Sequence, residues 1–286
     1  NQKPPYVIPN LIKKIKKAKK NKELNLTNLN HYRDFLSTND ISYAIGKLYK
    51  KNKSGIYNIG SGNKIASIAL AGKTVKLGGN IETQAVAGVV VTGDVTLTGH
   101  VAITTDANNG VVTFNDKIDG TGSAAQDFDI STHGTGAVTL KGNIGATTDK
   151  GLKTLDINKT AENAAITISG DIGATGQAGA GATNIGNNSM TATLSLDGSM
   201  YHTSGVTVYE ADALSFGKGA ATTVKSSETI NFNDATVTLE DGSSLTVDTS
   251  GANKAIVFQG AIDSADSTNA DETLTIDAGS GNVTLA

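Results

Sequence analysis

The side chains of this chain that could do chemistry are few and scattered. Asp127 and Asp129 are outward carboxylates that could bind Ca²⁺. Carboxylates on an exposed groove could also hydrolyse glycans, but nothing in the sequence singles out a pair for that reaction. The Gly-Gly-x-Gly-x-Asp nonapeptide of calcium-binding β-rolls is absent, so we interpret both as solvated surface. The four histidines, at positions 31, 100, 133 and 202, lack the short spacing of a metal site, and there is no cysteine. We therefore predict no catalytic residue, no metal and no cofactor.

A more specific pattern surrounds Arg33. The stretch 33–41 reads RDFLSTNDI, and residues 55–62 read GIYNIGSG. Together with Val7–Ile12, these motifs resemble the C-terminal part of the NAD-dependent nucleotide-sugar epimerases and dehydratases, and the resemblance covers residues 5–64. Ser37 and Thr38 stand where that family usually has His-Val.

The resemblance implies that Arg33 contacts the diphosphate of a nucleotide sugar, as a planar guanidinium does well. The family's glycine-rich phosphate turn and its Tyr-x-x-x-Lys pair lie upstream of this region and are not found here. Tyr43 and Lys47 have the pair's spacing but follow the arginine motif, so we interpret them as exposed helix residues. Without a nicotinamide site the segment cannot be an active epimerase alone.

The composition of the sequence changes abruptly near Lys64, so the residues discussed above belong to two different parts of the chain. Residues 1–64 hold 14 of the 24 Lys and Arg but 3 of the 27 Asp and Glu, which leaves 10 basic and 24 acidic residues in the remainder. The formal charges are therefore +11 and −14. We predict two parts, a basic α/β segment at 1–64 and a repeat region at 65–286. Helices are expected near 7–20, with an apolar stripe beside lysines, and near 39–50, followed by a strand at 56–59.

The second part repeats a triplet of two apolar residues around a central polar one, commonly Thr. Phe114 and Leu140 are 26 residues apart, Leu140 and Ile168 are 28 apart, and Phe258 and Leu285 are 27 apart. Short alternating strands at a long period predict coils that stack along an axis. We predict a mainly β fold, a right-handed parallel β-helix (β-solenoid) of about eight coils with a short N-terminal α/β segment. An antiparallel β-sandwich array is the alternative.

Two stretches of the repeat region fit the period less well. Residues 175–188 are low in large side chains and are predicted to form a protruding loop. Residues 197–235 keep the alternation, with Val206 and Val208 as an apolar pair around Thr207, but blur the period.

The repeat resembles the β-strand repeats of bacterial surface proteins, namely filamentous-haemagglutinin-like exoproteins, autotransporter passenger domains and related adhesins. The matching units are 138–147, 166–175 and 274–285. The resemblance implies an extracellular or cell-surface structural or adhesive protein that is not an enzyme. Its partners would be a host or cell-surface glycan or protein, and another copy could associate through the solenoid ends.

Other features limit the classes of function. The −14 charge of the repeat argues against nucleic-acid binding, and no apolar run is long enough for a transmembrane helix. The chain has no initiating Met and stops in mid-pattern, so we expect it to be a segment of a longer protein. The alternative function is a remnant of an NAD-dependent nucleotide-sugar epimerase or dehydratase fused to a repeat region.

Overall fold

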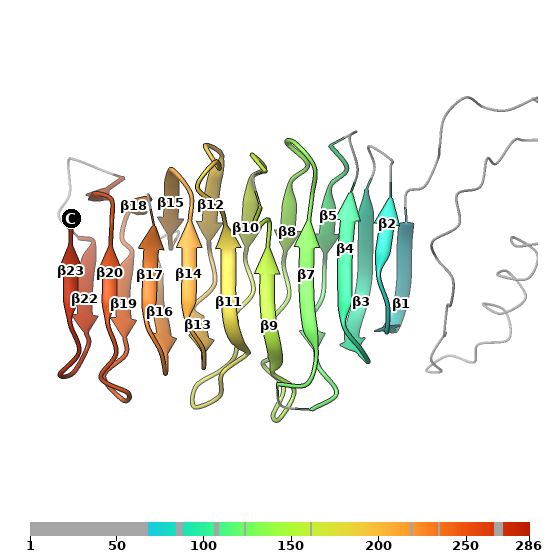
Figure 1. Cartoon of the computed structure of the whole chain (residues 1–286), viewed down its shortest axis with the longest axis horizontal. Helices are drawn as coiled ribbons and strands as arrows, with labels where there is room; N and C mark the ends of the chain where they lie inside the picture. Colours follow the sequence, from blue (N-terminus) through green and yellow to red (C-terminus); the bar gives the residue numbers. More distant parts are fainter. Residues whose placement is uncertain are drawn as a thin grey trace, which may run out of the picture.

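The computed structural model describes part of the chain, residues 68–286 without 84–87, 106–108, 123, 161, 218–219, 234 and 266–270. The predicted α/β segment 1–64, with its helices and its boundary to the repeat, lies outside the described residues. The described part contains strands and no helix. Its strands stack side by side along one long axis (Figure 1).

Two sheets make up the stack. In the first, the strands follow one another from coil to coil: β1 (Ile68–Leu77), β3 (Val89–Leu97), β5 (Val112–Phe114), β8 (Val138–Leu140), β10 (Ile166–Ile168), β12 (Thr193–Leu196), β15 (Ala213–Phe216), β18 (Thr236–Leu239) and β21 (Ile262–Ser264), with β6 (Ile118–Asp119) beside β3.

The second sheet has a main path and a branch. The main path runs through β2 (Ile81–Thr83), β4 (Val101–Thr105), β7 (Asp127–Ser131), β9 (Leu152–Ile157), β11 (Ala180–Gly186), β13 (Met200–Thr203), β16 (Ala221–Ser226), β19 (Ser244–Asp248) and β22 (Thr273–Asp277). The branch leaves β11 and continues through β14 (Thr207–Glu210), β17 (Ile230–Asn233), β20 (Ile256–Phe258) and β23 (Val283–Leu285).

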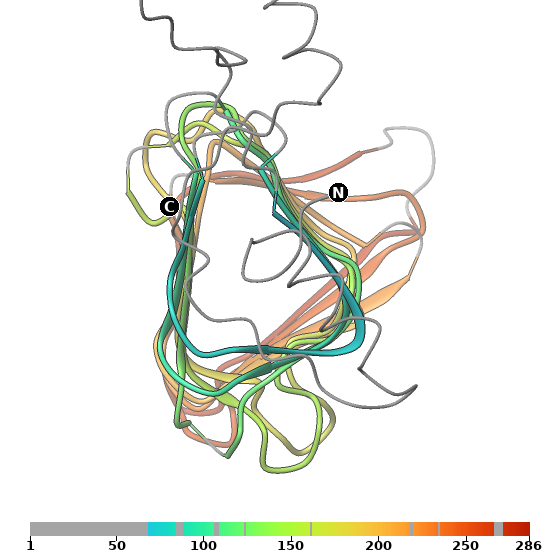
Figure 2. The same cartoon turned by 90° about the vertical axis from the view of Figure 1, so that its right-hand side faces the viewer.

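Every pairing between these named strands is parallel, and each strand pairs with its counterpart one coil away. The fold is therefore a β-solenoid of about eight turns, which confirms the predicted fold class and excludes the antiparallel sandwich. Viewed along the axis, the coils enclose a roughly triangular outline, which shifts in the C-terminal coils drawn in orange and red (Figure 2).

The register confirms the repeat that the sequence predicts. Phe114 pairs with Leu140, Leu140 with Ile168, and Phe258 with Leu285. Residues 197–235 depart from the predicted period because the coils there contain fewer residues. Thr193 pairs with Ala213 and Ala213 with Thr236, so fewer residues complete each of these two turns.

Inward side chains fill the core in ladders. Phe114, Leu140, Ile168 and Leu196 lie at equivalent positions of successive coils, and each is almost completely buried. Their outward neighbours are small and polar, as at Thr139. Each coil thus contributes a thin slice of core that the next coil covers, which is how solenoids obtain stability from neighbour contacts.

Polar side chains satisfy the buried main chain at one corner. Asn158 is fully buried, and its Oδ1 accepts a hydrogen bond of 2.8 Å from the Thr132 main-chain N–H. One coil further on, the Asn187 Nδ2 donates to the Asn158 carbonyl oxygen at 2.7 Å. The corner is therefore held from coil to coil by amide side chains, as buried backbone groups require.

The predicted loop at 175–188 is wrong. Strand β11 occupies residues 180–186, and its inward residues Ala180 and Ile185 pair with Leu152 and Ile157 of β9. Hydrogen bonds from the coils on both sides hold this strand, so its small side chains do not prevent it from forming. Of the predicted loop, residues 175–179 before the strand and residues 187–188 after it lie outside β11, and Ala174 and Gln177 exchange main-chain hydrogen bonds in the turn that precedes it.

The predicted phase around Thr207 is also wrong. Thr207 and Tyr209 point inward and are buried, whereas Val206 is 45% exposed. The register explains the inversion, because Thr207 and Tyr209 pair with the inward Ile230 and Phe232 of the next coil. The buried Thr207 hydroxyl meets the hydroxyl of Thr203, which reduces the cost of its burial.

Candidate functional site

In the part of the chain that the structure describes, a group of charged side chains lies close together on the outer face of β7 and β9. Asp127 and Asp129 alternate with the buried Phe128 and Ile130, so both carboxylates point outward, as predicted. The parallel register places Asp129 beside Asp156, which is one coil away on β9. We call Asp127, Asp129, Asp156, His100, Lys153 and Lys159 the acidic ladder.

Basic side chains compensate the carboxylates of the acidic ladder. The His100 imidazole lies between two of them, with Nδ1 3.7 Å from Asp127 Oδ2 and Nε2 3.4 Å from Asp129 Oδ2. Lys153 Nζ is 3.5 Å from Asp127 Oδ1, and Lys159 Nζ is 3.0 Å from Asp156 Oδ2. The two lysine contacts are ion pairs, and the His100 ring adds close polar contacts to the same half-exposed face.

Neutral side chains complete the network. Thr154 Oγ1 donates a hydrogen bond of 2.9 Å to Asp127 Oδ1. Asn184 on β11 donates through Nδ2 to Asp156 Oδ1 at 2.6 Å, one further coil along the stack. The acidic ladder therefore joins successive coils across the outside of the sheet.

Asp129 is the titratable centre of this group. Burial raises the pKa of Asp129 above its usual value, and the neighbouring Asp156 carboxylate raises it further, while His100 and Lys159 act in the opposite direction. An acid with a raised pKa beside another carboxylate can hold and exchange a proton. The outer face is open, and its carboxylates lie beside cationic side chains, an arrangement that can bind a polar ligand.

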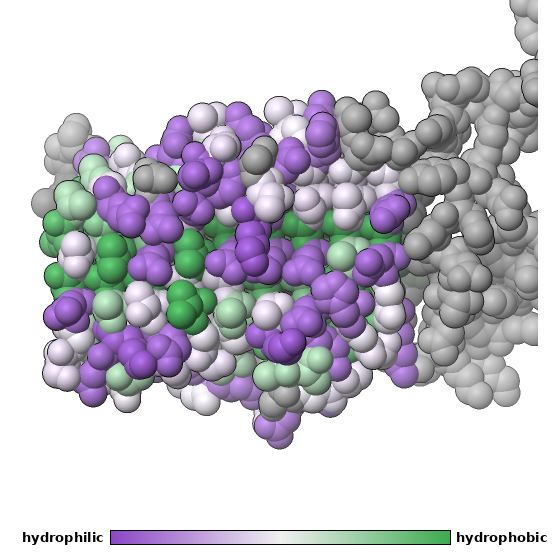
Figure 3. Space-filling model, in the orientation of Figure 1, coloured by the Kyte–Doolittle hydropathy of each residue, from purple (hydrophilic) through white to green (hydrophobic). Residues whose placement is uncertain are grey.

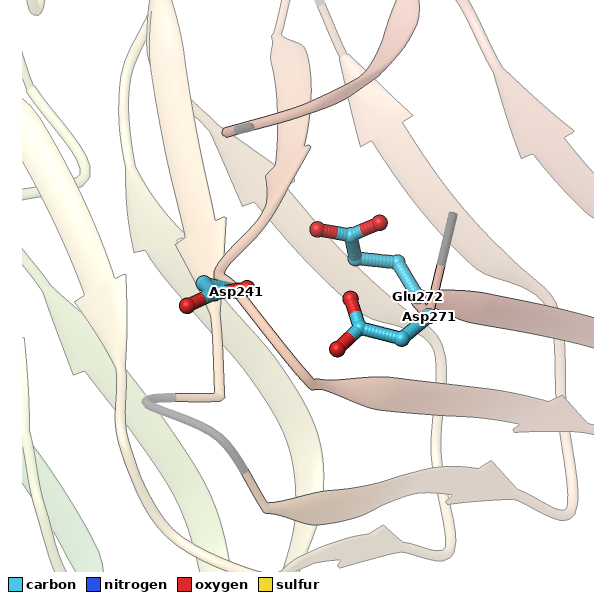
Figure 4. Close-up of side chains that lie close together, drawn as sticks. All are labelled: Asp241, Asp271 and Glu272. Carbon is cyan, nitrogen blue, oxygen red and sulfur yellow. The ribbon is translucent and has the colours of Figure 1, made fainter. Parts of the chain in front are cut away.

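A second group of carboxylates lies near the C-terminal end of the stack. Asp241 follows β18, and Asp271 and Glu272 precede β22; one oxygen from each lies within 4.8 Å of the others (Figure 4). The Glu272 Oε1 atom is buried and has no hydrogen-bond partner among the described residues. These residues could supply three oxygens to a hard cation such as Ca²⁺, which takes about six to eight, so they would form part of a site.

The structure brings together residues that the sequence analysis left apart. His100 and Asp156, which the sequence analysis did not connect with Asp127 and Asp129, complete the acidic ladder. The sequence contains the information that would have connected Asp129 with Asp156, because the two are separated by one predicted period. In the structure they pair across adjacent coils. His133 instead lies 3.6 Å from Glu162, and His202 is buried with Nδ1 near the Ala174 carbonyl.

Other predicted residues lie outside the described part of the chain. Arg33, the substrate-binding residue implied by the epimerase resemblance, is one of them, as are His31 and the Tyr43 and Lys47 pair. Within the described residues no helix is long and apolar enough to cross a membrane.

Comparison of the chain with protein-family models, curated proteins and solved structures finds no match. The solenoid architecture is therefore established by the structure, and the resemblances to surface adhesins and to epimerases stay predictions from the sequence.

Proposed function

We propose that the repeat region is a structural and adhesive part of an extracellular or cell-surface protein, that it is not an enzyme, and that it associates with further copies of itself. The observation that supports this proposal is the continuous parallel stack from β1 to β23. A stack of parallel coils gives a long lateral surface, which suits extended contact with a partner. Its outward residues are mainly short polar ones.

The acidic ladder is the part of this surface that we assign to adhesion. It offers carboxylate acceptors next to lysine and histidine donors on a half-exposed face, the combination that glycan hydroxyl groups recognise by hydrogen bonding. A cell-surface glycan or a polar protein surface is the partner class that fits this chemistry.

The location is tested on cells that produce the protein. Protease applied to intact cells should remove the repeat from immunoblots while a cytoplasmic marker survives. Survival of the repeat together with the marker would contradict an extracellular position. Electron microscopy of the purified full chain should show a rod, and a compact sphere by small-angle scattering would count against a structural role.

Adhesion is tested by binding the purified chain to a glycan array. Asp156→Asn should lower binding because it removes the charge that joins Lys159 and Asn184. Asp149→Asn is the matched control, since Asp149 is exposed in a turn and makes none of the contacts of the acidic ladder. Equal binding by both variants would exclude the acidic ladder as the adhesive face.

A further inference from the structure

The His100 imidazole lies where one coil of the acidic ladder meets the next. His100 directly precedes β4, whereas Asp127 and Asp129 lie on β7, one coil further along. Its Nδ1 atom is 3.7 Å from Asp127 Oδ2, and its Nε2 atom is 3.4 Å from Asp129 Oδ2. Both ring nitrogens therefore face a carboxylate oxygen of the neighbouring coil. The space-filling view shows hydrophilic residues over β4, β7 and β9 on this face (Figure 3).

The protonation state of the ring decides how well it fits between the two carboxylates. A carboxylate oxygen only accepts hydrogen bonds, and neutral imidazole carries one N–H and one nitrogen lone pair. Either neutral tautomer therefore turns a lone pair toward Asp127 or Asp129, and only the imidazolium has an N–H for each of them. Histidine is the side chain that ordinarily gains its charge between pH 8 and pH 5. The contact between the two coils is therefore sensitive to pH in this range.

The charged groups behind the two carboxylates come from β9 and the turn after it. Lys153 Nζ is 3.5 Å from Asp127 Oδ1. The Asp156 carboxylate lies beside Asp129 and has Lys159 as its ion-pair partner. Burial, and then the Asp156 charge, raise the pKa of Asp129, so this carboxylate can itself take up a proton in acid. A test of the histidine must therefore leave Asp129 unchanged.

The preceding coil contributes one acidic residue, Glu82 of β2, to the same side of the stack. Its register partner on β4 is Thr104, at the other end of the strand from His100. The start of β4 is fixed by Asn80, whose Oδ1 accepts a hydrogen bond of 3.0 Å from the Ala102 N–H. A change of charge at His100 is therefore expected to act on the carboxylates of β7.

We propose that His100 is a pH-dependent clasp that regulates the acidic ladder. Protonated His100 donates to Asp127 and Asp129, adds a side-chain tie between β4 and β7, and occupies the acceptors that a glycan hydroxyl group would use. Neutral His100 donates to one carboxylate and leaves the other to the ligand. Binding is therefore stronger near pH 8 than near pH 5. This regulation rests on the adhesive role proposed above, whereas the clasp between the coils does not.

The clasp is tested without a ligand, by hydrogen exchange of the full chain near pH 8 and near pH 5. Protection factors, corrected for the intrinsic effect of pH on exchange, should rise in acid by about two- to fivefold for amides of β4 and β7, as expected for half-exposed ion pairs. His100→Gln keeps a polar side chain that cannot gain a charge, so the rise should disappear. An equal rise in this variant and the wild type would overturn the clasp.

Two further variants separate the clasp from a simple ion pair. Asp127→Asn replaces one acceptor by an amide that can donate to the ring, so a neutral tautomer fits and the rise should largely disappear. A full rise would overturn the two-sided contact. His133→Gln is the matched control, because His133 is similarly exposed and its Nδ1 lies 3.6 Å from Glu162 Oε1, outside the acidic ladder. It should keep the wild-type rise in β4 and β7. Circular dichroism confirms that each variant keeps the wild-type spectrum.

The regulation is tested on the glycan array with the wild type, His100→Gln and His133→Gln near both pH values. Binding by the wild type and by His133→Gln should fall about two- to fivefold in acid, whereas His100→Gln should bind equally at both. Stronger binding in acid, or an equal fall in all three proteins, would overturn the regulation while adhesion stands. No binding at either pH, together with the expected hydrogen exchange, would reject the adhesive role and its regulation while the clasp stands.

Discussion

Replacing Phe232 by Ala should destabilise the C-terminal half of the solenoid more than any change on its surface. Phe232 is fully buried on β17 between two other coils. Its ring stacks on Tyr209 at a centroid distance of 5.5 Å and on Phe258 at 4.4 Å, and it meets Phe216 edge-on at 6.0 Å. These rings form a continuous aromatic ladder across three coils.

The expected magnitude follows from those contacts. Phe to Ala in a core costs about 3–5 kcal/mol, because the lost transfer free energy is added to that of the cavity. Each aromatic pair contributes about 0.5–1.5 kcal/mol beyond its buried area, and Phe232 makes three such pairs. The cavity left by Phe232 would be lined by the rings of Tyr209, Phe216 and Phe258. We therefore expect the free energy of unfolding to fall by an amount in the upper half of the range, about 4–5 kcal/mol.

The assay is urea unfolding of the full chain followed by circular dichroism, with hydrogen exchange to locate the opening. Amides of β17 and β20 should lose most protection, because stability in a solenoid depends on the neighbouring coils. Asn231→Ala is the matched control, since Asn231 is the adjacent outward residue of the same strand. A loss for Phe232→Ala within about 1 kcal/mol of the control would refute the reasoning.

Three further changes test the buried and titratable groups. Tyr209→Phe should raise the free energy of unfolding by about 1 kcal/mol, because the Tyr209 hydroxyl is buried without a described hydrogen-bond partner; a clear loss in urea unfolding would reveal a partner. Asn158→Ala should cost about 2 kcal/mol in the same assay, since it leaves the Thr132 N–H unsatisfied, and an unchanged midpoint would disprove that role. Asp129→Asn should be at least as stable as the wild type at neutral pH. Because the pKa of Asp129 is raised in the folded state, the free energy of unfolding of the wild type should rise as the pH falls through that pKa. The difference in stability between Asp129→Asn and the wild type should therefore shrink in acid. A difference that grows in acid would contradict the direction of the pKa shift.

The sequence was sufficient to predict the solenoid where large apolar residues occupy both inward positions of a triplet. Phe114, Leu140 and Ile168 mark successive coils, and the structure pairs them in that register. Their spacing is readable because a period-2 strand with one buried face tolerates no slip of one residue. The antiparallel alternative could be rejected only from the structure, since alternation is the same in both arrangements.

The errors arose where two phases of the alternation compete. Around Thr207 the sequence offers Val206 with Val208, or Thr207 with Tyr209, as the inward pair. Thr207 and Tyr209 form the inward pair because Tyr209 stacks on Phe232 and meets Phe216 edge-on, contacts that Val208 could not make. Those partners lie in adjacent coils or strands, so a window of neighbouring residues does not contain the information that decides the phase.

The acidic ladder shows the same dependence on register. The alternation around Phe128 predicts that Asp127 and Asp129 point outward, but it does not predict which charges surround them. That answer depends on the length of the coil, because Asp156 becomes the neighbour of Asp129 only if the coil between them has its full length. With the shorter spacing found between Thr193 and Ala213, the same aspartate would face a different residue. A site on the lateral surface of a solenoid is therefore predictable from sequence only when the number of residues in each coil is known. Insertions that change this number also change which side chains lie beside one another.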